Sequence, residues 1–188
     1  MISIPVSTPS RSYEVLIGRG LLARPGESLG KLIGNRRTFI VTVPPVRRRW
    51  AKVLLKSLAS SGIDTEVLEM PDGERSKRLA TLEKLAEKLV KHGADRGVTL
   101  IALGGGVVCD VTGFLASIYM RGVDVIQIPT TVQAQVDAAI GGKTGVNLVS
   151  GKNLLGTFHQ PRAVLVDPEV LATLPSREYH AGLYESLK

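Results

Sequence analysis

The sequence predicts an α/β domain with a mainly parallel sheet. Short apolar runs of strand length alternate with longer stretches in which apolar residues recur at helical spacing. One apolar run, residues 98–103, leads directly into three consecutive glycines, as in a turn between a strand and a helix. The 188 residues include 20 glycines and only 4% aromatic residues, which indicates an aliphatic core with many tight turns.

The first half of the chain alternates strands with helices. We expect strands at residues 13–17, 38–43 and 65–70, and helices at 47–60 and 76–92. The run at 38–43 is continuously apolar and is closed by two prolines, which is typical of a strand buried on both faces. Gly93 is expected to cap the second helix.

The second half continues this alternation. We expect strands at 98–103, 125–128 and 163–166, helices at 107–119 and 131–139, and a glycine-rich segment at 141–156. A last helix begins near Ser176 and meets no stop signal before Lys188, so we expect the natural protein to continue. The predicted domains are therefore residues 1–175 and, at 176–188, the first helix of a second domain.

Charge and cysteine content restrict the partners and the compartment. The 24 Lys and Arg against 17 Asp and Glu give a net charge of +7. Because the basic residues are scattered and few aromatics could stack on bases, we expect phosphorylated small molecules rather than nucleic acid. The run Arg47-Arg48-Arg49 is expected to be a solvated helix face. A single cysteine and the lack of any apolar stretch of about 20 residues predict a cytoplasmic protein without membrane contact.

The triple-glycine turn, Gly104-Gly105-Gly106, is the first candidate site. A glycine turn lets the backbone approach a phosphate closely, and the following helix offers unpaired N–H groups to it. A dinucleotide pyrophosphate would lie there, although such turns also serve plain packing. The usual pattern of three spaced glycines would place its last glycine at 109, where Cys109 stands instead.

The glycine-rich segment is the second candidate site. Gly141 to Thr144 looks like the end of a phosphate-binding P-loop, but Asp137 stands where that motif needs glycine. Its polar residues either converge on a ligand or face solvent: Asp137, Lys143, Thr144, Asn147, Lys152, Asn153 and His159. The three histidines are far apart and Cys109 has no partner, so spacing alone defines no metal site.

Motifs along the whole chain resemble those of the 3-dehydroquinate synthase family. They are Pro71-Asp72-Gly73-Glu74-x-x-Lys77, Gly104-Gly105-Gly106-Val107-Val108-x-Asp110, Tyr119-Met120-Arg121-Gly122, Pro129-Thr130-Thr131, Gln135-Val136-Asp137, Gly141-Gly142-Lys143-Thr144-Gly145-Val146-Asn147, Gly151-Lys152-Asn153, Phe158-His159-Gln160-Pro161, Thr173-Leu174-Pro175 and Ala181-Gly182-Leu183-x-Glu185-x-x-Lys188. The blocks that begin at Gly141 and Gly151 are the most specific.

The resemblance implies an enzyme of the shikimate pathway, made of a Rossmann-like NAD-binding domain and a helical domain lacking here. It implies conversion of 3-deoxy-D-arabino-heptulosonate 7-phosphate to 3-dehydroquinate and phosphate, with transient oxidation by NAD. It also implies a zinc or cobalt ion, with two further ligands from the helical domain.

The resemblance carries specific roles onto the matching residues. Those implied for cofactor binding are Asp72, Glu74, Lys77, Gly104, Gly105, Gly106, Val107, Asp110, Thr130, Thr131, Lys143, Lys152, Thr173 and Leu174. Those implied for catalysis are Asp137, Lys143, Asn153, Lys188 and Arg121, and Glu185 is the implied metal ligand. Arg121 would reach the substrate phosphate in a neighbouring subunit, which implies a homodimer.

Two positions depart from the family pattern. Val43 stands where the family usually has Asp or Asn to hold the adenine ribose, so either NAD affinity is lower or Glu74 holds the ribose alone. Cys109 replaces a usual glycine, and a left-handed backbone there would cost about 1–2 kcal/mol.

Three alternatives stay open. Another sugar phosphate cyclase usually lacks the Gly141–Asn147 run, and a metal-dependent polyol dehydrogenase rarely carries Arg121 or the Lys152-Asn153 pair. The third is an NAD-binding module without catalysis, which this fragment alone would be. The family hypothesis also predicts that Gly105 and Lys152 line opposite walls of a single crevice.

Overall fold

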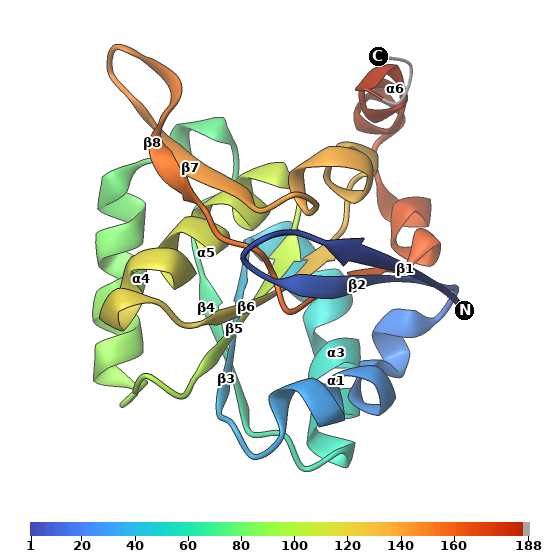
Figure 1. Cartoon of the computed structure of the whole chain (residues 1–188). Coiled ribbons are helices and arrows are strands. Elements are labelled where there is room, and N and C mark those ends of the chain that lie inside the picture. Colours follow the sequence, from blue (N-terminus) through green and yellow to red (C-terminus); the bar gives the residue numbers. More distant parts are fainter. Residues whose placement is uncertain (186–188) are drawn as a thin grey trace.

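The computed structural model describes residues 1–185, with side chains described except those of residues 25–28 and 185. Its centre is a seven-stranded sheet with the order β1-β2-β9-β6-β5-β3-β4 (Figure 1). The strands are β1 (Ile2–Ser7), β2 (Ser12–Ile17), β3 (Thr38–Thr42), β4 (Thr65–Glu69), β5 (Thr99–Gly104), β6 (Asp124–Pro129) and β9 (Ala163–Val166). Only β1 with β2 pairs antiparallel in this sheet, so the predicted mainly parallel α/β fold is confirmed.

Helices cover both faces of this sheet. On one face lie α4 (Leu79–Lys91) and α5 (Gly106–Ile118), and on the other lie α1 (Pro25–Ile33) and α3 (Lys52–Ser60) (Figure 1). Each face buries its own cluster of aliphatic side chains. Every residue of β3 and β5 is buried, which is why these strands read as continuous apolar runs in the sequence.

The glycine-rich segment folds into an antiparallel hairpin of β7 (Lys143–Leu148) and β8 (Gly151–Phe158). The hairpin packs on α5 at Gly113, where an added Cβ would lie 2.5 Å from Thr144 Cγ2. Within the hairpin, a Cβ on Gly156 would lie 1.9 Å from the Thr144 carbonyl oxygen. Glycine is therefore required where the hairpin meets the helix and where its two strands cross closely.

The remaining elements are shorter. They are η1 (Leu21–Ala23), α2 (Pro44–Val46), the π-turn η2 (Arg47–Ala51), η3 (Glu74–Ser76), η4 (Tyr119–Arg121), the π-turn η5 (Ala134–Ala138), η6 (Pro168–Thr173) and α6 (Ser176–Glu185). The predicted helices are all present, and Gly93 has a φ of 69°, as its capping position requires. The strand β1, the helix α1 and the hairpin were not predicted. Within the described range, no helix is long and apolar enough to cross a membrane.

The strand order reverses between β3 and β5. From β3 the chain continues outward to β4, whereas from β5 it continues in the other direction to β6. In open α/β sheets, ligands bind beyond the carboxyl ends of the strands at such a reversal. This rule points to the ends of β3 and β5.

Candidate functional site

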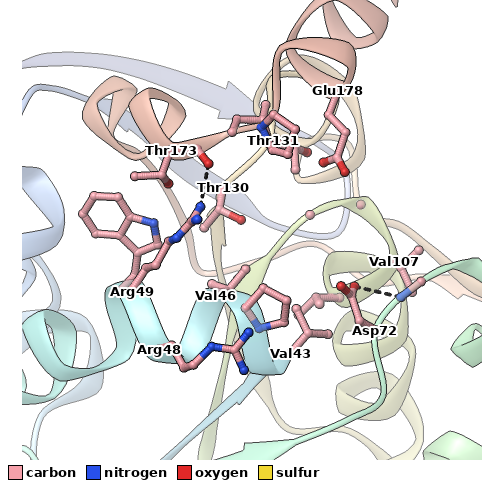
Figure 2. Close-up of a pocket in the computed structure, with 18 residues that line it drawn as sticks. Val43, Val46, Arg48, Arg49, Asp72, Val107, Thr130, Thr131, Thr173 and Glu178 are labelled. Atoms are coloured by element: carbon pink, nitrogen blue, oxygen red, sulfur yellow. Dashed lines mark hydrogen bonds between the residues drawn. The ribbon is translucent and has the colours of Figure 1, made fainter.

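A pocket of about 540 Å³ lies at that reversal, which we call the crevice pocket. Its walls come from the residues after β3, the loop after β4, the first turn of α5, the residues after β6 and the junction of η6 with α6 (Figure 2). Eight residues expected to contact the cofactor line it: Asp72, Gly105, Gly106, Val107, Thr130, Thr131, Thr173 and Leu174. Segments far apart in the sequence thus meet at one cavity.

The triple-glycine turn shapes the floor of the crevice pocket. A Cβ on Gly104 would lie 2.5 Å from Val108 Cγ2, and a Cβ on Gly105 would lie 3.0 Å from Thr131 Cγ2. Gly105 caps α5 with a φ of −77°, so glycine serves close packing here rather than an unusual backbone. The first N–H groups of α5 have no partner within the helix, and a helix start of this kind suits an anionic group.

Cys109 does not strain this turn. It lies inside α5 and is fully buried, and its N–H donates to the Gly105 carbonyl at 3.1 Å. The cost that a left-handed backbone would carry at this position therefore does not arise, because the backbone of Cys109 is helical. Burial, with a smaller contribution from Asp110, raises the pKa of the Cys109 thiol far above its ordinary value.

All three arginines of the run are exposed, as expected of a solvated helix face, but two of them also line the crevice pocket. Arg47 does not line the crevice pocket, and it pairs with Glu69 at 2.7 Å. Arg48 and Arg49 line the pocket, and Arg49 Nη1 donates to the Thr173 carbonyl at 2.6 Å (Figure 2). Sequence reasoning missed both, although their place in the first turns after β3 was a usable signal.

A second pocket of about 420 Å³ lies between α5, η5 and the hairpin, and we call it the hairpin pocket. Four residues expected at the site line it: Asp110, Asp137, Lys143 and Asn153. Lys143 Nζ donates to Asp137 at 2.9 Å. This pocket is therefore rich in both charge signs and in amide groups.

A chain of polar contacts connects residues of the hairpin pocket to the loop after β4. Lys77 Nζ donates to the carboxylate of Asp110 and to the side-chain oxygen of Asn153. The Asn153 N–H donates to Asn147 Oδ1 at 2.9 Å, and Asn147 Nδ2 donates to Glu74 Oε1 at 2.7 Å. The loop after β4, the helix α5 and the hairpin are thus joined by one network.

Lys77 is the most deeply buried charge in this network. Lys77 is 5% exposed and lines neither pocket, but it contacts Asp110 and Asn153, which both line the hairpin pocket. Burial raises the pKa of Asp110, while the hydrogen bond and charge of Lys77 act against that rise. A buried pair of this kind is costly to break, because the remaining charge loses its partner.

The structure divides the expected site between two pockets rather than one crevice. Gly105 lines the crevice pocket and Asn153 the hairpin pocket, while the exposed Lys152 lines neither. The first turns of α5 stand between them, with Gly106 on one side and Asp110 on the other. The prediction that Gly105 and Lys152 share a single cavity is therefore wrong, although the two pockets adjoin the same helix.

Three further expected site residues lie apart from both pockets or outside the described residues. Arg121 is exposed in the turn after α5, with a left-handed φ of 70°. The side chain of Glu185 and the whole of Lys188 lie outside the described residues. In the described range, no group of three His, Cys, Asp or Glu side chains could hold a metal ion.

The fold and the glycine turn at the strand reversal define a Rossmann-like α/β domain. The family model for the 3-dehydroquinate synthase N-terminal domain matches residues 67–181, and the chain belongs to that family. The match includes the loop after β4, the glycine turn and the whole hairpin.

Curated relatives agree along the whole chain. The 3-dehydroquinate synthase of Koribacter versatilis (strain Ellin345) is 53% identical and that of Solibacter usitatus (strain Ellin6076) is 54% identical. Each match includes 100% of this chain and 52% of the relative. The chain thus spans about half the length of these relatives.

Solved structures of sugar phosphate cyclases have the same fold. A 2-deoxy-scyllo-inosose synthase complexed with carbaglucose-6-phosphate, NAD+ and Co2+ matches with a TM-score of 0.91 at 28% identity, over 99% of this chain and 50% of its own. A 2-epi-5-epi-valiolone synthase from Streptomyces hygroscopicus subsp. jinggangensis 5008, with NAD+ and Zn2+ bound, matches with a TM-score of 0.85 at 34% identity, over 96% of this chain and 49% of its own.

Proposed function

We propose that this protein acts as a 3-dehydroquinate synthase in the cytoplasm. It would convert 3-deoxy-D-arabino-heptulosonate 7-phosphate to 3-dehydroquinate and phosphate. The observation that carries the proposal is that the family's motifs fold into two pockets on either side of α5. Residues 1–175 would form the cofactor domain, residues 176–188 would begin a second domain, and this chain alone would have no turnover.

The crevice pocket is the proposed NAD site. Its 540 Å³ falls within the range of small-molecule pockets, about 300–1,000 Å³. The N–H groups of Gly106 and Val107 at the start of α5 would receive the pyrophosphate, and Thr130 and Thr131 lie beside the same glycine turn, where their hydroxyls could also bind the cofactor. When bound, NAD supplies a hydride acceptor for the transient oxidation.

The hairpin pocket is the proposed sugar phosphate site. Lys143 would attract the anionic substrate. Asp137, which accepts a hydrogen bond from the Lys143 ammonium group, would orient that lysine. Asn153 has its N–H bound to Asn147 and its side-chain oxygen bound to Lys77, so its position is fixed from two sides. Glu185 is proposed as one ligand of a zinc or cobalt ion.

A homodimer is proposed from Arg121 and its surroundings. The residues next to it are apolar and exposed, with Ile118 at 47% and Met120 at 39%. Exposed apolar side chains next to a strained turn suit an interface. Sedimentation equilibrium should show a dimer that Ile118→Asp dissociates, whereas Val90→Asp, at a 59% exposed position elsewhere on the surface, should leave it intact.

Titration of NAD into this chain tests the cofactor site. Trp50 is the one tryptophan and lines the crevice pocket, so its fluorescence should report binding alongside calorimetric heat. Gly105→Val should abolish binding. A Cβ added at this position would lie 3.0 Å from Thr131 Cγ2, and the two methyl groups of valine would fill the pocket floor. Gly30→Ala is the matched control, since nothing lies within 4 Å of that Cβ. Absence of any heat or fluorescence change with the unaltered chain would refute the proposed site.

A further inference from the structure

The hairpin departs from regular strand pairing beside the hairpin pocket. A bulge interrupts the pairing of β7 with β8, and there Asn147 of β7 alone stands opposite residues 152–154 of β8. The middle residue of these three, Asn153, has a left-handed φ of 55°. Asparagine adopts this backbone more readily than most residues, but the surrounding structure must still hold it there. The position of Asn153 therefore depends on its contacts.

The side-chain amide of Asn147 supplies one of these contacts and connects it to the loop after β4. Its Oδ1 accepts the N–H of Asn153 at 2.9 Å, and its Nδ2 donates to Glu74 Oε1 at 2.7 Å. The reversed amide would set its NH2 group against an N–H and its oxygen against a carboxylate. The two partners therefore fix a single orientation of this amide, and Asn147 is only 8% exposed.

The backbone of Asn147 holds Lys77 in the same way. The Asn147 N–H donates to the Lys77 carbonyl at 2.8 Å, while Lys77 Nζ donates to the side-chain oxygen of Asn153. Lys77 and Asn153 thus contact each other through their side chains, and Asn147 holds both of them by their backbones. The three residues form a closed ring, so displacement of Asn147 would move both of the others.

This ring connects the walls of the two pockets. Asn153 lines the hairpin pocket, and Asp72, in the loop that also carries Glu74, lines the crevice pocket. Asn147 itself lines neither pocket. Its contacts therefore suit a residue that acts on a ligand through its neighbours.

We propose that Asn147 is a positioning residue, which fixes Asn153 for the sugar phosphate through its amide and does not touch the ligand. The inference rests on the proposed function, because it requires that the hairpin pocket binds the sugar phosphate. It deepens that function by assigning the geometry of the pocket to a donor and an acceptor outside it.

Calorimetric titration of 3-deoxy-D-arabino-heptulosonate 7-phosphate into the chain saturated with NAD tests this role. Asn147→Asp keeps an acceptor for the Asn153 N–H but sets a second carboxylate against that of Glu74. The Kd for the sugar phosphate should therefore rise about tenfold. Asn35→Asp is the matched control, since it adds the same charge at an exposed position and should change this Kd less than about twofold.

A second variant exchanges the donor and the acceptor between the two positions. In Asn147→Asp/Glu74→Gln, the new carboxylate can accept both the Asn153 N–H and the new amide, and the net charge equals that of the unaltered chain. The Kd should return to within about threefold of the unaltered value. Glu74→Gln alone completes the cycle and should not tighten binding. A role in packing alone would not be restored by a change at Glu74.

Circular dichroism of each variant separates loss of binding from loss of the fold, and the double variant decides the question if the single variant does not fold. An unchanged Kd in a folded Asn147→Asp variant, or no recovery in the double variant, would overturn the inference and leave the proposed function standing. If the unaltered chain binds no sugar phosphate, the proposed function of the hairpin pocket fails, and the inference fails with it.

Discussion

Replacement of Lys77 by methionine should destabilise the fold and loosen the hairpin pocket. Methionine keeps the length of the side chain but removes the charge that contacts Asp110 and Asn153. Removing one partner of a buried pair typically costs 3–5 kcal/mol. Because the side chain of Asp110 is 19% exposed, against 7% for Lys77, water can relieve part of that cost. We therefore expect a loss of about 3 kcal/mol in the free energy of unfolding.

Urea unfolding followed by circular dichroism measures this loss. Lys84→Met on the exposed face of α4 is the control and should stay within about 0.5 kcal/mol of the unaltered chain. The double variant Lys77→Met/Asp110→Leu should recover at least half of the loss, since it removes the orphaned carboxylate as well. A loss below about 1 kcal/mol, or no recovery in the double variant, would refute the role assigned to the pair.

The same variant should change how stability depends on pH. The pKa of Asp110 is raised in the folded state, chiefly by burial, so its contribution is fully present at low pH and is lost as pH rises through the folded pKa. Without Lys77 the pKa should rise further. Unfolding free energy of Lys77→Met should therefore fall more steeply with rising pH above the ordinary range of a carboxyl group than that of the unaltered chain.

Further predictions concern other parts of the fold. Asp124 forms ion pairs with Arg11, Arg36 and Arg162, and their charges hold the pKa of its carboxyl below the usual value. Its contribution to the free energy of unfolding should therefore be lost as pH falls through that lowered pKa. Asp124→Asn should remove about 1–3 kcal/mol of this free energy at neutral pH and flatten its dependence on acid pH, as measured by urea titrations. Gly113→Ala should cost about 1–3 kcal/mol in thermal unfolding because its Cβ meets the hairpin, whereas Gly30→Ala should gain up to about 1 kcal/mol. Cys109 should react with a thiol reagent only at the rate of unfolding, and rapid labelling of the folded chain would contradict its burial.

The elements that the sequence predicted are those whose residues are buried on both sides or on one helical stripe. β3 and β5 read as unbroken apolar runs because neighbouring strands and two helical layers enclose them. The strand β1 was missed because Ile2 and Ile4 are exposed on an edge strand, which hides the usual alternation. The hairpin was missed because its glycines are typical of a loop in the sequence. In the structure these glycines lie where other atoms of the hairpin leave no room for a side chain.

The candidate site was only partly readable from sequence for a related reason. Motifs named most of the residues that line the two pockets, but they could not say on which side of α5 each side chain lies. Arg47 and Arg48 show this limit: Arg47 pairs with Glu69, whereas Arg48 lines the crevice pocket. Consecutive residues on a helix point in directions about 100° apart, so the two side chains meet different surroundings. Periodicity finds the helix, and only the packed neighbours decide which arginine faces the cavity.

The position of α5 gives the two pockets a shared wall, through which ligands bound in them would influence each other. One rigid helical turn presents backbone amides to the crevice pocket and the Asp110 carboxylate to the hairpin pocket. A dinucleotide that drew the amides toward its pyrophosphate would also shift Asp110, to which Lys77 is bound, and through Lys77 the side chain of Asn153. By linkage, the factor by which a ligand in the crevice pocket changes the affinity of the hairpin pocket equals the factor by which a ligand in the hairpin pocket changes the affinity of the crevice pocket. Cofactor and substrate would then bind cooperatively without a separate regulatory element.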